Sequence, residues 1–348
     1  MKMESVNDAL YDHITNFLDS VKSRKRAVCD IEVGKRVRSK FVNSLRERND
    51  MINSINRRRF MQSAGLGVAA FALSRNRLVL GNPYDLPIGL QLYTVRDHLA
   101  KDLSGTLAKV AEIGYREVEV GDFNYYGKKP AELRAILSEY GLKAISTHYT
   151  EYQLKSDLQK HLADAKECGI TYVGLASLDD KDRKSLDAIK RDAEWFNKLG
   201  EAIDRAGCHF HYHGHNFDYA TLDGGAVIYD ELIRRTDAKT VNFQLDCFWC
   251  VRAGKDPVDY FDRFPGRFPQ LHIKDLKPGY PPTTGEDFRK GAFTEVGQGV
   301  IDWKRIFQAA PKGGLKHFYV EQEECDRDSL ESAKISYTYL HNLTVSSC

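Results

Sequence analysis

Short apolar runs alternate with helical patterns from residue 88 to residue 343, and this alternation restricts the fold more than any other feature of the chain. Eight runs are predicted as strands: 88–93, 117–120, 143–147, 172–175, 209–213, 241–245, 271–274 and 317–321. Helical spacing is predicted over 103–113, 130–140, 154–168, 186–206, 226–235, 257–264, 303–310 and 329–343. Several of these helices stop at a glycine, the usual C-cap residue: Gly114, Gly141, Gly169 and Gly207. Strands that alternate with helices favour parallel βα units, and eight units predict a closed (β/α)8 TIM barrel.

An open doubly wound sheet is the alternative arrangement of the same units. The first predicted strand, however, is not followed by a GxGxxG turn. Polar residues suited to a site follow nearly every strand, whereas an open sheet would gather them at one switch point. In a barrel all the strand ends meet at one mouth, so the sequence favours the barrel.

Composition excludes several classes of protein. The 348 residues are enough for one large α/β domain, and 42% hydrophobic with 29% charged residues is typical of globular proteins. The net charge of +2 predicts no nucleic-acid partner. The seven cysteines predict no disulfide framework, and the CxxC of Cys247 and Cys250 lacks the second CxxC of a zinc site. No apolar run of about 18 residues predicts a stable membrane span.

The first 85 residues are predicted to lie outside the barrel, which we place at residues 86–348. Residues 1–55 form a polar leader that is either helical or disordered. Residues 56–85 resemble a twin-arginine export signal and linker, with Arg57 and Arg58 as the pair before a short apolar stretch. This signal predicts a periplasmic protein. An ordinary amphipathic segment is the alternative, and it would leave the protein in the cytoplasm.

Histidines recur at every second position of the fifth predicted strand: His209, His211, His213 and His215. Alternate residues of a strand point to one face, so these imidazoles share a face if the strand runs that far. Imidazole is a frequent ligand of transition metals and a frequent general base. The simpler interpretation is an edge strand whose histidines are solvated.

Further polar residues stand at or just past the other strand ends: Gln91, Tyr93, Glu117, Glu119, His148, Asp246, His272, Lys274, Asp275, Glu321 and Glu323. Each alone is explained by a structural salt bridge or a helix cap. Together, two carboxylates and two imidazoles would form a mixed nitrogen and oxygen site that suits Mn²⁺, Co²⁺, Zn²⁺ or Fe²⁺.

The chain from about residue 86 to residue 343 resembles the xylose isomerase-like TIM barrels, the sugar phosphate isomerase/epimerase superfamily. The matching stretches are GLQLYTVRD (89–97), YREVEVG (115–121), HYHGHNFDY (211–219), LDCFWCVRAGKDP (245–257), LHIKD (271–275), EVGQGVIDW (295–303) and YVEQEE (319–324). The resemblance implies a divalent metal held by Glu, Asp, His and Glu. Asp246, His272 and Glu321 match the last three ligands. His213 stands in place of the first Glu, with His211 and His215 as alternatives.

The resemblance also implies an isomerase or epimerase that acts on a keto-sugar or glycoside through a metal-stabilised enediolate, with a lyase or dehydratase as the alternative. Many relatives use two acidic residues on opposite faces of the substrate, but the fourth strand ends in YVGLASL, which has no carboxylate. His148, Lys274 and His215 are therefore the candidate acids and bases. The absence of a Gly-rich phosphate loop favours a free sugar over a sugar phosphate.

Four residues are predicted to bind the carbohydrate: Gln91, Tyr93, Glu119 and Trp249. Tyr93, Trp249 and Phe248 would stack on the apolar face of the sugar, unless they are packing residues of the barrel rim. Two other classes stay open, a sugar-binding barrel without catalysis and an abasic-site nuclease. The near-neutral charge argues against the nuclease. A homo-oligomer is compatible with the sequence.

Overall fold

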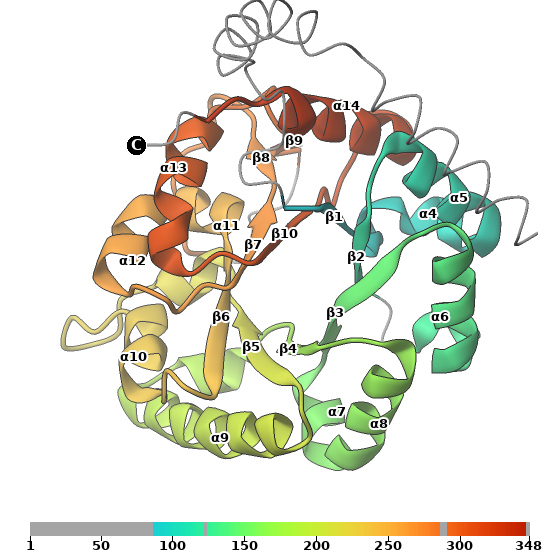
Figure 1. Ribbon diagram of the computed structural model, residues 1–348. Coiled ribbons are helices and arrows are strands. Elements are labelled where there is room, and N and C mark those ends of the chain that lie inside the picture. The colour runs from blue at the N-terminus through green and yellow to red at the C-terminus, as the bar shows by residue number, and fades with distance from the viewer. Residues whose placement is uncertain (1–85, 122–123, 286–290, 346–348) are drawn as a thin grey trace, which may run out of the picture. The chain divides into compact units, whose positions relative to one another are not determined.

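The computed structural model describes residues 86–121, 124–285 and 291–345. The predicted leader and export signal, residues 1–85, therefore lie outside the described residues. Eight parallel strands close into a barrel in the order β1-β10-β7-β6-β5-β4-β3-β2, which confirms the predicted TIM barrel (Figure 1). The barrel strands are β1 (Ile88–Gln91), β2 (Glu117–Val120), β3 (Lys143–Tyr149), β4 (Tyr172–Leu175), β5 (His209–His213), β6 (Val241–Asp246), β7 (Gln270–Ile273) and β10 (His317–Val320).

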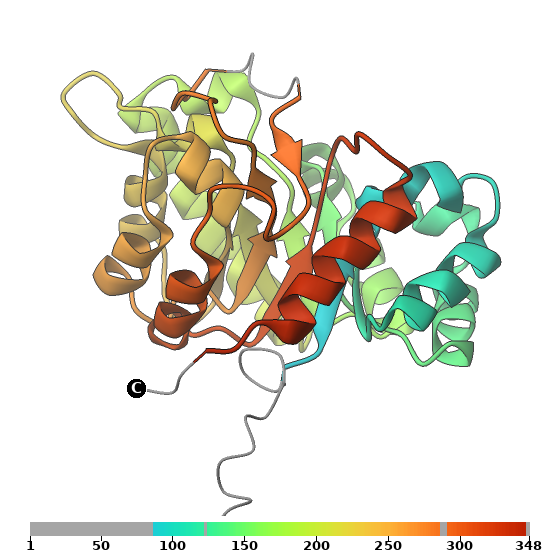
Figure 2. The same ribbon diagram turned by 90° about the horizontal axis from the view of Figure 1, so that it is seen from above.

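Helices surround the barrel on its outside (Figures 1 and 2). They are α4 (Arg96–Leu99), α5 (Leu103–Ile113), α6 (Pro130–Glu139), α7 (Glu151–Ser156), α8 (Leu158–Cys168), α9 (Leu186–Arg205), α10 (Ile228–Arg235), α11 (Cys247–Arg252), α12 (Pro257–Arg263), α13 (Trp303–Gly313) and α14 (Ser329–Asn342). Polar side chains cap several of these helices, as where Ser185 accepts a hydrogen bond from the backbone N–H of Ala188 at the start of α9. The apolar face of α9, with Phe196 and Ile203 fully buried, packs on the barrel.

Several element boundaries differ from the sequence prediction. β1 ends at Gln91 because the Gln91 side chain accepts a hydrogen bond from the N–H of Tyr93 and starts a 3-10 turn, Leu92–Val95. The helix predicted over 154–168 is two helices, because Asp157 leaves the helical conformation and its side chain caps α8. The long loop after β7 contains a small antiparallel pair, β8 (Asp275–Leu276) and β9 (Phe293–Thr294).

The barrel interior is polar toward the mouth. Parallel register sets His211 beside Gly174 and Asp246 beside His272. Gly174 leaves room for two imidazoles, because a Cβ there would lie 2.3 Å from Nε2 of His211 and 2.8 Å from the ring of His148. Small residues on one strand thus make space for histidines on its neighbours.

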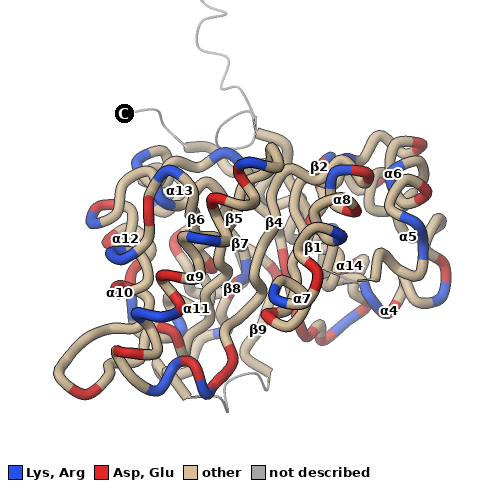
Figure 3. The backbone as a smooth tube through the Cα atoms, turned by 90° about the horizontal axis from the view of Figure 1, so that it is seen from below, with Lys and Arg blue, Asp and Glu red and all other residues tan. Residues whose placement is uncertain are grey.

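The outer surface carries charges of both signs, interspersed along the chain (Figure 3). Within the described ranges, no helix is long and apolar enough to span a membrane. Cys247 and Cys250 are buried in α11, and burial raises the pKa of both thiols well above the usual value.

Candidate metal centre and active site

Four side chains from adjacent strands converge at the barrel mouth. His213 ends β5, Asp246 ends β6, His272 lies on β7, and Glu321 follows β10. One ligand atom of each lies within 4.8 Å of the other three, and all four residues are buried. The structure thus brings together the four residues predicted as metal ligands.

The hydrogen bonds of the two imidazoles direct one nitrogen of each toward the carboxylates. Nδ1 of His213 lies 3.1 Å from the carbonyl oxygen of Ala176, to which it donates, so Nε2 carries the lone pair and lies 3.3 Å from Oδ2 of Asp246. Nδ1 of His272 lies 3.0 Å from Oε2 of Glu321 and 3.5 Å from Oδ2 of Asp246. This Nδ1 makes no hydrogen bond to any described residue.

The four residues fit a divalent metal. Two imidazole nitrogens and two carboxylate oxygens form the mixed donor set that Zn²⁺, Mn²⁺, Fe²⁺ and Co²⁺ accept in proteins. Each residue offers an atom that its other hydrogen bonds leave available, and buried carboxylates need a positive charge nearby. The buried Nδ1 of His272, which has no hydrogen-bond partner within the part of the chain that the structure describes, is the ligand position that such an ion would satisfy.

The charged groups in and beside the cluster shift one another's pKa values. Burial would raise the pKa of Asp246, but the positive charge of Lys274 outweighs it and holds that pKa well below the usual value. Burial would lower the pKa of His272, but the charges of Glu119 and Glu321 outweigh it and hold the pKa well above the usual value. Without a bound ion, an ammonium and an imidazolium balance the carboxylates, and an ion would take the place of the proton on Nδ1 of His272.

Glu119 holds His272 in place from the side opposite the cluster. Its Oε1 lies 2.5 Å from Nε2 of His272 and accepts a hydrogen bond from Nε2 of Gln91 at 2.8 Å. Its Oε2 accepts hydrogen bonds from Oγ of Ser146 at 2.6 Å and from Nε2 of Gln244 at 2.8 Å. A carboxylate that accepts the outer N–H of a metal-binding histidine fixes its tautomer and raises its basicity.

The predicted substrate contacts of Gln91 and Glu119 differ from what the structure shows. Gln91 is 2% exposed and Glu119 is fully buried. Their side chains bond each other, and the remaining oxygen of Gln91 accepts the N–H of Tyr93. Both residues therefore support the ligands from within the barrel.

The two oxygens of Asp246 have separate partners. Oδ1 accepts a hydrogen bond from the backbone N–H of Trp249 at 2.9 Å and so caps α11, while Oδ2 faces the cluster. The same turn buries Trp249 completely, with its ring 5.2 Å from Nζ of Lys274. Phe248 stacks on Phe293 in the core. α11 turns both rings into the protein, and the predicted stacking of Trp249 and Phe248 on a sugar stays a prediction.

Lys274 lies at the centre of the carboxylates. Nζ is 2.9 Å from Oδ2 of Asp246, 2.5 Å from Oε2 of Glu321 and 3.0 Å from Oε1 of Glu323. Burial would lower its pKa, but Asp246 and the two glutamates outweigh this and raise it above the usual value. Lys274 is therefore a buried ammonium that contacts two of the four predicted ligands.

His148 lies beside the cluster as a neutral imidazole. Its ring centroid is 5.0 Å from that of His213 and 5.6 Å from that of His272. Nε2 lies 2.8 Å from Oε1 of Gln244 and donates to it, because the amide nitrogen of Gln244 already donates to Glu119. Burial, opposed in part by Glu119, lowers the pKa of His148 to about 4. Nδ1 is then the proton acceptor of this ring.

The other two histidines of β5 and its loop occupy different positions. The ring of His215 lies 4.6 Å from that of His213 and stacks on Phe217 at 5.0 Å, at the edge of the cluster. His211 is fully buried below the cluster, with Nε2 4.0 Å from Oε2 of Glu119. Of the histidines considered as the first ligand, His213 is the one that contacts Asp246.

Tyr93 keeps the exposure that a substrate-binding residue needs. It is 41% exposed, and the guanidinium of Arg96 lies 4.0 Å above its ring. Arg96 also donates to the carbonyl oxygen of Glu323 at 2.7 Å, so Tyr93 is tied to the segment that follows β10. The predicted stacking of Tyr93 on a sugar stays a prediction.

Three supporting residues were missed by sequence analysis: Ser146, Gln244 and Glu323 as the partner of Lys274. Ser146 and Gln244 each stand two positions before a predicted site residue, His148 and Asp246, on the same face of their strands. That alternation is the signal that could have identified them.

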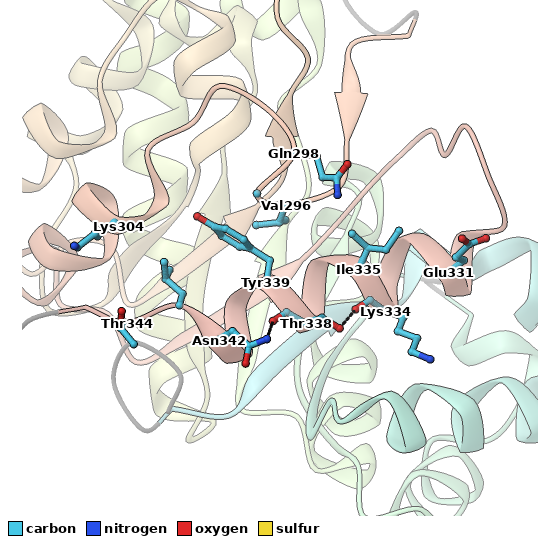
Figure 4. Close-up of a pocket in the computed structure, with 12 residues that line it drawn as sticks. Val296, Gln298, Lys304, Glu331, Lys334, Ile335, Thr338, Tyr339, Asn342 and Thr344 are labelled. Carbon is cyan, nitrogen blue, oxygen red and sulfur yellow. Dashed lines mark hydrogen bonds between the residues drawn. The ribbon is translucent and has the colours of Figure 1, made fainter. Parts of the chain in front are cut away.

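A cavity of about 800 Å³ lies elsewhere, along α14 (Figure 4). Val296, Tyr339, Lys334 and Thr338 are among its lining residues, and none of the four predicted ligands is. The chemistry of the buried cluster, rather than the size of this groove, therefore identifies the candidate site.

Comparisons with known proteins agree with this architecture. An inosose dehydratase of Lacticaseibacillus casei is 27% identical over 240 residues, which cover 61% of this chain and 79% of the relative. A crystal structure of a sugar phosphate isomerase/epimerase from Parabacteroides distasonis aligns with a TM-score of 0.64 and 26% identity over 74% of this chain and 94% of that one. A crystal structure of the IolI protein with a bound zinc atom shares the fold, with a TM-score of 0.59 and 15% identity over 74% of this chain and 98% of that one.

The family model described as the xylose isomerase-like TIM barrel matches residues 107–339, which hold all four predicted ligands as well as Glu119, His148 and Lys274. The match spans every barrel strand except β1. The chain belongs to the xylose isomerase-like TIM barrel family.

Proposed function

We propose that the protein is a divalent-metal-dependent lyase that removes water from a polyhydroxy ketone, such as a keto-sugar or keto-cyclitol. The observation that carries this proposal is the buried set of His213, Asp246, His272 and Glu321 with an ammonium and a neutral imidazole beside it. The relatives named inosose dehydratase and the zinc-bound IolI protein support the reaction class and the metal.

His213, Asp246, His272 and Glu321 would hold the ion, and a bound divalent ion would polarise the substrate carbonyl and stabilise negative charge on its oxygen. Glu119 keeps the Nε2 proton of His272 away from the ion and leaves Nδ1 as the ligand atom. The carbonyl oxygen of Ala176 does the same for Nδ1 of His213.

His148 and Lys274 have the protonation states that an elimination needs. Near pH 7, His148 is neutral and accepts the proton from the carbon next to the carbonyl. Lys274 is protonated and donates a proton to the hydroxyl that leaves from the following carbon. One C–H and one C–O bond break, a C=C bond forms in conjugation with the carbonyl, and water departs. Environments that push two pKa values apart are typical of acid and base pairs in active sites.

Isomerisation or epimerisation is the second candidate, and the likeness to a sugar phosphate isomerase/epimerase favours it. Both reactions begin with loss of the same proton. Epimerisation needs a second acid on the opposite face of the substrate, and β4, which ends at Leu175 before Ala176, supplies no carboxylate there. Dehydration needs a single base and a single acid, so it uses the residues that are present.

Metal content and product mass together test the proposal. The wild-type protein should bind about one divalent ion per chain, and Asp246→Asn, which keeps an oxygen to cap α11, should lose it. Asp218→Asn is the matched control, because Asp218 is equally buried nearby but, among the described residues, its side chain accepts hydrogen bonds from Tyr212 and the His215 backbone instead of contacting the cluster. The loaded enzyme is then incubated with keto-cyclitols and ketoses in D₂O.

Loss of one water with growth of enone absorbance supports dehydration. Deuterium incorporation without loss of mass supports the isomerase or epimerase instead. A protein that binds no metal after loading with Mn²⁺, Co²⁺ and Zn²⁺ would refute both mechanisms.

A further inference from the structure

Four carboxylates gather at the rim of the barrel, away from the metal centre. We call Glu151, Asp179, Asp182 and Asp192 the rim cluster. Glu151 begins α7 directly after β3, Asp179 and Asp182 lie in and beside the 3-10 turn Asp180–Arg183 after β4, and Asp192 lies on α9. One oxygen each from Glu151, Asp179 and Asp182 lies within 4.8 Å of the other two. Three separate segments thus bring negative charge to one place.

Asp192 gives this cluster a buried charge without a partner. It is only 6% exposed, and its Oδ2 is buried without a hydrogen bond to any described residue. Oδ2 of Asp182 is likewise buried without a hydrogen bond. Burial, together with the charges of Asp182 and Glu151, raises the pKa of Asp192 to about 7. A buried carboxylate beside other carboxylates is costly unless a cation neutralises it.

The positive side chains nearby do not balance the rim cluster. Lys155 pairs with Glu151, and Nζ of Lys181 lies 3.1 Å from Oδ2 of Asp179 and 3.8 Å from Oδ2 of Asp182. The Lys181 side chain is 73% exposed and that of Lys155 is 49% exposed, so both flexible stems can move into solvent. Arg191 acts on Asp192 through its charge. Four carboxyl groups thus face three positive side chains, and two of these are lysines on exposed stems that a dication can displace.

We propose that Glu151, Asp179, Asp182 and Asp192 form a second cation site, of the calcium type, at the rim of the barrel. The proposed donors are carboxylate oxygens, which hard cations prefer, and those of Glu151, Asp179 and Asp182 lie close together without an imidazole or thiolate to attract a transition metal. Asp192 adds a buried carboxyl group that the charges of Asp182 and Glu151 reach. Ca²⁺ suits donors on loops because it accepts irregular geometry and completes its coordination with water. The chemistry therefore differs from that of the His213 cluster.

The cation would join the loop after β4 to α7 and α9. That loop begins at Ala176, whose carbonyl oxygen holds Nδ1 of His213, and it reaches Ser185, which caps α9. A cation that fixes residues 179 and 182 relative to α9 therefore fixes the loop that positions a ligand of the metal centre. The site is structural and does not depend on the proposed reaction.

Calcium binding by the transition-metal-loaded protein tests this site. In calcium-free buffer, titration calorimetry should detect one Ca²⁺ per chain. At about 100 times the dissociation constant, the thermal midpoint should rise on the order of 5 °C. Tb³⁺, which binds calcium sites, should show luminescence sensitised by Trp195, whose ring lies 4.5 Å from Nζ of Lys155.

Asp192→Asn and Asp182→Asn should remove the calcium response while the protein stays folded, because each substitution also relieves repulsion in the rim cluster. Asp187→Asn is the matched control, since Asp187 is an exposed residue of the same helix that pairs with Lys190. Asp246→Asn should keep the response, which separates this site from the metal centre. No midpoint change at millimolar Ca²⁺, an equal response in Asp192→Asn, or tighter binding of Mg²⁺ than of Ca²⁺ would each overturn the proposal.

Discussion

Replacing Glu119 with glutamine tests whether this buried carboxylate positions His272 as a metal ligand. Each oxygen of Glu119 accepts two hydrogen bonds, Oε1 from Gln91 and His272 and Oε2 from Ser146 and Gln244. A glutamine offers one oxygen and one NH₂ group, so two of the four donors would face another donor. Each buried donor without an acceptor costs about 1–3 kcal/mol, so Glu119→Gln should lower the free energy of unfolding by roughly 2–6 kcal/mol.

Metal affinity should fall as well, because His272 loses the acceptor that fixes its tautomer. Removal of such an outer partner weakens metal binding by about 10- to 100-fold, which corresponds to roughly 1.4–2.7 kcal/mol. The assay is competition with a chromophoric chelator, at a temperature where circular dichroism shows the variant folded. Stability is measured separately by urea unfolding of the metal-free protein.

Glu117→Gln provides the matched control. Glu117 lies on the same strand and the same face, is 7% exposed, and contacts Nδ1 of His317 at 2.8 Å instead of the metal centre. This variant should lose stability but keep wild-type metal affinity. The reasoning fails if Glu119→Gln binds metal as tightly as wild type, or if Glu117→Gln weakens metal binding equally.

Three further substitutions probe separate features. Lys274→Met should tighten metal binding, because it removes an ammonium 2.9 Å from Asp246, yet it should slow turnover by about 100-fold or more. Unchanged turnover would exclude an acid role, and Lys277→Met is the control, since Lys277 is half-buried and pairs with Asp326. Gly174→Ala should cost about 1–3 kcal/mol in urea unfolding, because its Cβ would lie 2.3 Å from His211, whereas Gly285→Ala has room and should be neutral. Burial raises the pKa of Asp218 from 3.8 to about 6, so the folded state holds this proton more tightly and the contribution of Asp218 to stability falls as pH rises through that range. The stability of wild type relative to Asp218→Asn should therefore fall by at most about 3 kcal/mol between pH 4 and 7, and a flat difference would contradict the shift.

The cluster of His213, Asp246, His272 and Glu321 was predictable from sequence because its members stand at strand ends. Asp246 ends β6 and His272 lies on the next strand, β7. Parallel register in a barrel places such residues side by side. The sequence pattern could therefore identify the cluster, although it could not by itself distinguish His213 from His211 as the ligand. That distinction depends on where β5 stops relative to β6.

The role of Glu119 was not predictable, because its partners are dispersed along the chain. Gln244 is 125 positions away and His272 is 153 positions away. Which side chains meet across the barrel depends on its closure, and no local pattern encodes that. Trp249 is buried for a local reason, because Asp246 caps α11 and this helix turns the indole into the core.

One oxygen of Asp246 caps α11, and the other faces the predicted metal ligands. The opening of α11 and the binding of an ion are therefore linked equilibria. The oxygen that caps α11 cannot move without displacing the one that faces His213 and His272. An ion that binds only when α11 is folded must lower the population of the opened helix by mass action. Amide hydrogen exchange in residues 247–252 should then report metal occupancy directly, so this short helix could serve as an internal sensor of the state of the site.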